Sequence, residues 1–218
     1  MLTRFAKVYS FFSAEMKAQL YKGTLKQQFD VDPYRARHAL NRLQSDVEEL
    51  DPLTQMLYID TRANLPDDLL MVGDKTGMAN SLEVRVPFLD YRLVEFVEGV
   101  PAHLKLKGFT GKYLHKKACE KWLPKKVVYR KKKGFDNPVE KWFRVRMRSF
   151  VEDCLLGADS SMGRYFDQNY IRRILESDRE GKEQYRRQIY LLVTLELWHR
   201  TFLRNQPLHV QPCARSSS

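Results

Sequence analysis

A run of cationic side chains from Tyr129 to Pro138 combines residue types that could bind an anion. The run passes through Gly134 into a helix start, with Asn137 at the N-cap and Pro138 at the first helical position. Cationic side chains and the free N–H groups of a helix N-terminus favour the same ligand, such as phosphate. Two other interpretations stay open: a solvated lysine run without a partner, and nuclear targeting or nucleic-acid affinity.

A second stretch, residues 73–90, places charges among apolar residues. Its sequence is GDKTGMANSLEVRVPFLD, and the charged positions of interest are Asp74, Glu83 and Arg85. The apolar neighbours predict partial burial, and a charge in such surroundings must be paired or functional. The stretch therefore predicts either a buried ion-pair network, such as Glu83 with Arg85, or a functional site.

The net charge of +11 is concentrated in one segment of the chain. Lys and Arg number 38 and Asp and Glu 27, but residues 101–133 hold twelve of the cations and only one acid, Glu120. The rest of the chain sums to zero. A local basic block implies a local anionic partner: phosphate, nucleic acid, an acidic membrane surface or an acidic protein.

Composition excludes several classes of protein. A hydrophobic fraction of 43% can bury a core, so the chain as a whole is not expected to be disordered. No apolar run approaches the ~20 residues of a transmembrane helix, and no secretory signal is expected. The three cysteines are an odd number without metal-ligand spacing, which indicates reduced thiols and a cytoplasmic location.

These residues must be positioned by helices, because apolar residues recur at helical spacing almost throughout the chain. Strand signals are weak, and the best is the short Val127–Tyr129. The predicted fold class is mostly α. We expect a break at Pro87, a loop over 157–164, an all-round apolar helix from 184 to 203, and helices at 3–21, 34–50, from 52, from 66, 91–98, 112–122, from 138 and 170–176.

Several motifs together resemble the carboxyl-terminal part of the synthetase domain of glutamine-hydrolysing asparagine synthetases. They are LPDDLL at 65–70, Asp74-Lys75, SLEVRVPFLD at 81–90, Leu123-Pro124, and RKKKGF at 130–135 followed by Pro138. Their order and spacing agree with the family pattern, and the resemblance covers about residues 50–203. It implies the helical later half of an adenine-nucleotide-hydrolase-like (PP-loop) α/β synthetase domain. We therefore expect a partial domain at 1–205, with its motifs within 65–138, and a disordered tail at 206–218.

The resemblance also implies a reaction and residue roles. Family enzymes are ATP-dependent carbon–nitrogen ligases that adenylate aspartate and let glutamine-derived ammonia attack the acyl-adenylate, with ATP and Mg²⁺ as cofactors. Lys132 matches the family lysine that would stabilise the charge growing as pyrophosphate leaves, and Arg130 would support it or bind phosphate. Glu83 would orient Lys132 or act as a general base, while Asp74 and Arg85 would position substrate. No metal ligand is assigned.

Several parts of the family pattern do not occur in this sequence. These are the glutaminase domain with its catalytic cysteine, the S-G-G-x-D-S pyrophosphate loop and a downstream acidic motif. We therefore expect a fragment, a split subunit or a pseudogene product that is inactive alone and exposes an apolar face. Its partner would be the missing amino-terminal part or a second copy, with no membrane and no nucleic acid. The alternative is a stand-alone basic helical module that binds nucleic acid or another polyanion.

Overall fold

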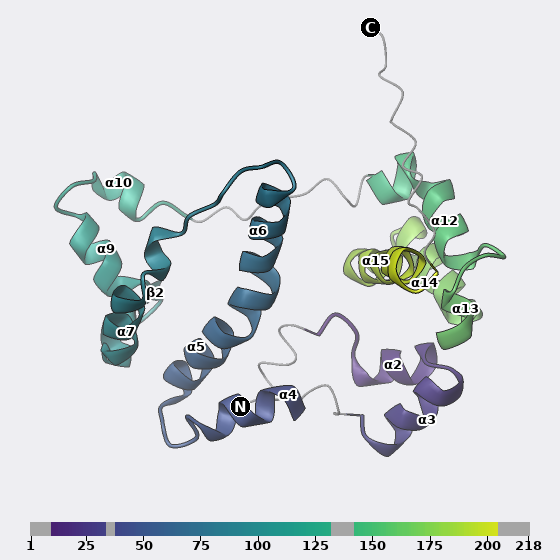
Figure 1. Cartoon of the computed structure of the whole chain (residues 1–218), viewed down its shortest axis with the longest axis horizontal. Coiled ribbons are helices and arrows are strands. Elements are labelled where there is room, and N and C mark those ends of the chain that lie inside the picture. The colour runs from purple at the N-terminus through teal and green to yellow at the C-terminus, as the bar shows by residue number, and fades with distance from the viewer. Residues whose placement is uncertain (1–9, 34–37, 132–141, 205–218) are drawn as a thin grey trace, which may run out of the picture. The chain divides into compact units, whose positions relative to one another are not determined.

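The computed structural model describes residues 10–33, 38–131 and 142–204, and Figure 1 shows their helices. The chain divides into two compact units. Within the described residues, unit 1 comprises 38–131 and unit 2 comprises 10–33 and 142–204. Each unit is described by itself. The expected single partial domain at 1–205 stays a prediction, and the expected tail at 206–218 lies outside the described residues.

Most of the described chain is helical, which confirms the predicted mostly α class. Its one sheet is an antiparallel hairpin of β1 (Leu106–Lys107) and β2 (Thr110–Gly111). The weak strand signal at Val127–Tyr129 does not produce a strand, because Val127 and Val128 belong to helix α10 (Lys125–Val128). Pro124 begins this turn, and its carbonyl accepts from the Val127 N–H at 2.8 Å. A short β-branched run without a partner strand has too little to gain from extension.

Two helices of unit 1 begin directly after an aspartate whose carboxylate caps the helix N-terminus. The Asp51 carboxylate accepts from the backbone N–H groups of Leu53 and Thr54, at 3.0 and 3.1 Å, and Asp90 accepts from Arg92 N–H at 3.0 Å. The other elements of this unit are α4 (His38–Ser45), α5 (Pro52–Arg62), η2 (Leu65–Leu70), α6 (Met71–Met78), η3 (Pro87–Leu89), α7 (Tyr91–Gly99), α8 (Ala102–Lys105) and α9 (Tyr113–Cys119).

The motif LPDDLL does not start a new helix, which corrects the prediction. It forms a π-helical turn, η2, through which α5 continues into α6, so that the two lie along one column in Figure 1. Pro66 has no N–H to donate, and in a regular α-helix its ring would clash with the carbonyl of Arg62. A wider turn relieves that clash, and the N–H of Met71 reaches back to the carbonyl of Pro66.

Unit 2 joins two segments that are far apart in the sequence. The N–H of Lys22 donates to the carbonyl of Tyr165 at 2.9 Å, and the N–H of Asp167 donates to that of Leu20 at 2.7 Å. The unit consists of α2 (Ala14–Leu20), α3 (Gly23–Val31), η4 (Trp142–Arg146), α12 (Arg148–Leu156), α13 (Met162–Tyr165), α14 (Gln168–Glu180) and α15 (Arg186–Phe202).

The helices of unit 2 differ from the predictions at four points. The helix expected from residue 3 begins, within the described residues, at Ala14, because the Ser13 side chain accepts from the N–H of Met16 and caps it. Helix α3 was not predicted, and α13 lies inside the predicted loop 157–164. The long final helix is buried on one face only, since Trp198 and Phe202 on α15 are exposed.

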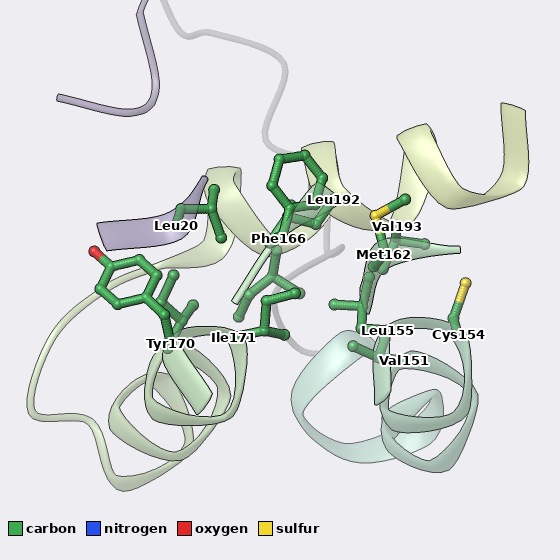
Figure 2. Packing of buried hydrophobic residues seen from close by; sticks show 12 residues of the cluster. Leu20, Val151, Cys154, Leu155, Met162, Phe166, Tyr170, Ile171, Leu192 and Val193 are labelled. Atoms are coloured by element: carbon green, nitrogen blue, oxygen red, sulfur yellow. The ribbon is translucent and has the colours of Figure 1, made fainter. Parts of the chain in front are cut away.

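The core of unit 2 is closed. Twelve buried side chains from α2, α12, α13, α14 and α15 and the residues next to them form one cluster (Figure 2). Leu155, Met162 and Ile171 have no exposed surface. Burial also raises the pKa of the Cys154 thiol to about 11, so this cysteine is a packing residue that stays protonated.

A buried polar network ties α13 to α15 beside this core. The Glu196 carboxylate accepts from the N–H of Ser161 at 2.9 Å and from Nε of Arg200 at 2.6 Å. His199 Nδ1 lies 2.9 Å from the Ser161 hydroxyl, and its Nε2 lies 3.3 Å from the Tyr165 hydroxyl. Because Ser161 is buried, this Ser–His contact has no route to a substrate, and its role is structural.

Unit 1 contrasts with this arrangement, because few of its described residues are buried. They are Val47, Gln55 and Ile59. The partial burial predicted for residues 73–90 is wrong: the large apolar side chains there are 44–68% exposed, namely Met78, Leu82, Val84, Val86 and Phe88. The expected exposed apolar face is therefore found in this unit.

Candidate functional site

The chain turns sharply at the end of α6 and passes close to Gly77, and this turn holds the charged stretch that follows. The N–H of Leu82 donates to the carbonyl of Gly77 at 3.0 Å, and Ser81 takes a left-handed φ of 56°. A Cβ on Gly77 would lie 2.7 Å from the carbonyl oxygen of Leu82 and 3.0 Å from a methyl of Val84. Glycine is therefore required at this position. The close contact fixes the direction in which the segment that contains Glu83 and Arg85 leaves α6.

Glu83 and Arg85 form the ion pair that the sequence suggested, but not in a buried place. An Arg85 guanidinium nitrogen lies 2.9 Å from Glu83 Oε1, and the two side chains are 82% and 67% exposed. An exposed pair of this kind contributes only about 0–1 kcal/mol to folding. The pair is therefore not a stabilising core element, and both groups are accessible to a ligand.

The segment that leads into the basic loop is anchored by its single acid. The hydroxyl of Tyr129 donates to Glu120, and Lys117 Nζ lies 3.0 Å from Glu120 Oε1. These two contacts hold the pKa of Glu120 below its usual range, and the hydrogen bond to Glu120 raises the pKa of Tyr129. Sequence reasoning missed Glu120 as an anchor, although its isolation among twelve cations was a usable signal.

The described residues bring together only part of the predicted site. Glu83 and Arg85 are in contact, and Asp74 is exposed on α6. Arg130 is exposed just after α10 in the same unit, and the described part of the chain shows no contact between it and that pair. Lys132 lies outside the described residues, so its approach to Glu83 stays a prediction.

A groove of about 660 Å³, which the sequence did not predict, lies elsewhere in unit 1. Its walls are mainly apolar side chains of α5, η3 and α7. An Arg62–Glu98 pair joins α5 to α7 with nitrogen–oxygen distances of 2.7 and 3.1 Å, and the guanidinium stacks on the Tyr58 ring at 3.7 Å. None of the predicted site residues lines this groove, so the two features are separate.

The Arg62–Glu98 pair gives unit 1 a pH-dependent stability. Hydrogen bonding by Arg62 holds the pKa of Glu98 below its usual range. A carboxyl whose pKa is lower in the folded than in the unfolded state stabilises the fold at a pH above the unfolded-state pKa. That stabilisation is lost as the pH falls through the folded-state pKa. We expect Glu98→Gln to lower the free energy of unfolding at pH 7 by about 0.2–1 kcal/mol, a small value because the pair is half-exposed. Urea unfolding should show no such loss at pH 2.5. Glu95→Gln on the same helix is the control, and an equal loss at both pH values would contradict the assignment.

The described residues do not fit a metal site. No group of three or more His, Cys, Asp or Glu side chains among them could hold an ion. A search of the same residues for a helix of the length and apolar character required to cross a bilayer found none.

Comparison with known proteins agrees with the motifs of unit 1. The family model for asparagine synthase matches residues 2–200, and the chain therefore belongs to the asparagine synthase family. Asparagine synthetase [glutamine-hydrolyzing] 1 of Bacillus subtilis is 35% identical over 147 residues, 67% of this chain and 23% of the relative. A putative asparagine synthetase of Mycobacterium tuberculosis (strain H37Rv) is 34% identical over 155 residues, 71% of this chain and 24% of the relative.

A third relative carries a different name. The amidase chyE of Penicillium rubens is 34% identical over 98 residues, 42% of this chain and 15% of the relative. No solved structure matches the chain. The chain spans about a quarter of the length of the two synthetases.

Proposed function

We propose that this chain supplies the later, helical part of a PP-loop synthetase domain that amidates aspartate through an acyl-adenylate, at the expense of ATP. The observation that carries the proposal is the match of residues 2–200 to the asparagine synthase family. The exposed Glu83–Arg85 pair supports it, because charged groups that bind ligand must be accessible.

In this proposal the basic loop acts on the phosphates. Negative charge grows on the leaving pyrophosphate, and a fixed cation lowers the energy of that transition state. Lys132 is the proposed cation, and Arg130, exposed after α10, binds phosphate beside it. The hydrogen bond from Tyr129 to Glu120 supports this role, because it anchors the backbone immediately before Arg130.

Glu83 is proposed to work beside Lys132. Arg85 binds one of its carboxylate oxygens, so that the other can orient the lysine ammonium or accept a proton from the attacking amine. Asp74 and Arg85 are proposed to position the substrate. ATP and Mg²⁺ would be held mainly by groups of the complete enzyme.

The chain is proposed to need a partner for this chemistry. The exposed apolar side chains of unit 1 favour a covering surface, which would be the amino-terminal part of a synthetase or a second copy of this chain. We therefore propose that the isolated chain is inactive, since adenylation requires all its charge-stabilising groups at once. We propose a cytoplasmic location, because ATP, glutamine and reduced thiols are found together in the cytoplasm.

A chimera tests the proposal. The part of this chain that aligns with the Bacillus subtilis synthetase over 147 residues replaces the aligned segment of that enzyme, and aspartate- and ATP-dependent pyrophosphate release is measured for the chimera, the parent and the isolated chain. We expect release from the chimera and none from the isolated chain. A chimera that folds like the parent but releases no pyrophosphate would contradict the assignment, as would turnover by the isolated chain.

A further inference from the structure

The hairpin, α9 and α10 follow one another in unit 1 (Figure 1), and the residues in and between them include exposed lysines and aromatic rings, with Lys116 half-buried. Trp122 is 75% exposed, and Phe109 at the hairpin turn is fully exposed. We call these residues the lysine–aromatic surface: Lys107, Phe109, Lys112, Lys116, Lys121, Trp122, Lys125 and Lys126.

The positive charge of this surface is scarcely neutralised by its own segment. Residues 101–131 contain ten Lys or Arg and one acid, Glu120, which Lys117 and Tyr129 already occupy. Lys112 and Lys116 lie four residues apart, which is about 6 Å along a helix. Such a row of cations attracts a chain of regularly spaced anions.

The aromatic rings distinguish between polyanions. Among the described residues, neither Phe109 nor Trp122 takes part in a ring–ring or cation–π contact, whereas Tyr113 and Tyr129 are each paired with a lysine. In sequence, Lys107 and Lys112 flank Phe109, and Lys121 and Lys125 flank Trp122. A free ring between cations suits an unpaired base, which stacks while its phosphates meet the lysines.

Two other polyanions fit less well. Duplex bases are already stacked and leave nothing for Phe109 and Trp122 to contact. A membrane surface is bound by amphipathic helices that bury one long apolar face, and α9 has seven residues and α10 four. We propose that the lysine–aromatic surface binds single-stranded RNA or DNA without sequence preference.

Binding to a labelled twenty-nucleotide oligouridine and oligothymidine, followed by fluorescence anisotropy over a range of salt, tests this proposal with the full chain. The logarithm of the association constant should fall linearly with the logarithm of salt, with a slope of about −0.7 per lysine engaged. The double variant Lys116→Gln/Lys125→Gln should reduce the magnitude of that slope by about 1.4. The double variant Lys22→Gln/Lys182→Gln, at two exposed lysines of unit 2, is the charge-matched control and should leave the slope unchanged.

The aromatic contribution is tested separately. Trp122→Ala should weaken binding by about 5- to 150-fold without changing the salt slope, and Trp122→Phe should retain most of the affinity. Circular dichroism of each variant checks that the helices are intact. These readouts do not involve synthetase activity, so they stand or fall independently of the proposed function.

Several outcomes would overturn the proposal. Binding that Lys22→Gln/Lys182→Gln weakens as much as Lys116→Gln/Lys125→Gln would show a general charge effect, and a neutral Trp122→Ala would exclude stacking. Equal affinity for a duplex of the same length would exclude single-strand recognition. Tighter binding to vesicles containing phosphatidylserine than to either oligonucleotide would assign the surface to membranes instead.

Discussion

Lys132→Ala is expected to lower the turnover number of the chimeric synthetase by about 10²- to 10³-fold, the usual effect of losing one group that stabilises transition-state charge. The Michaelis constant for aspartate should change little, because the ammonium acts on the leaving pyrophosphate and not on the bound substrate. The measurement is steady-state pyrophosphate release at varied aspartate and saturating ATP.

The neighbouring lysines provide matched controls for this variant. Lys131→Ala and Lys133→Ala remove the same charge from the same loop and should retain activity close to that of the unchanged chimera. The activity contributed by a phosphate-site lysine depends on its position, whereas a general electrostatic effect depends only on the number of charges removed. Equal losses for all three variants would therefore rule out the role assigned to Lys132.

Leu155→Ala is expected to destabilise unit 2 by about 2–5 kcal/mol, the second large effect. Its side chain is fully buried in the cluster shown in Figure 2, and removing it leaves a cavity as well as losing apolar burial. Natural domains have only about 5–15 kcal/mol of stability, so this loss would unfold much of the unit near physiological temperature. Urea unfolding followed by circular dichroism measures it.

Leu203→Ala makes the same chemical change on an exposed side chain of unit 2 and should cost less than about 0.5 kcal/mol. Native-state hydrogen exchange adds a regional view, because the helices around the closed core should exchange most slowly. Similar costs for Leu155→Ala and Leu203→Ala would show that the cluster does not form in solution.

Local sequence signals predicted the parts of the fold that local physics determines. Asp51-Pro52 and Asp90 marked helix starts because a capping carboxylate satisfies N–H groups two or three residues away. Helix α14 extends its prediction by two residues at one end and four at the other. Helix α3 was missed because Gly23 and two glutamines obscure its pattern, although its Leu25 packs against the core of unit 2.

Burial could not be predicted in the same way. The apolar residues between Met78 and Phe88 suggested a covered segment, yet they are exposed. A hydrophobic pattern shows that a surface is suited to burial, but not whether the covering element is part of the same chain.

The candidate site was predictable as a set of residue types and not as a geometry. The Glu83–Arg85 contact follows from a spacing of two along an extended segment, and it was suggested correctly. The groove between α5 and α7 was not, because it depends on Arg62 meeting Glu98, thirty-six positions further along the chain. The position of Lys132 relative to Glu83 stays a prediction for the variants above to test.

The wide turn at LPDDLL bears on how this protein could tolerate changes in length. A residue added to an α-helix rotates everything beyond it by about 100°, which would turn the side chain of Asp74 to another face. A π-turn absorbs one additional residue and leaves the following helix in phase. Deleting Pro66, the residue that a regular helix cannot accommodate, should therefore restore a regular helix and leave α6 facing as before, whereas a deletion within α6 itself would not.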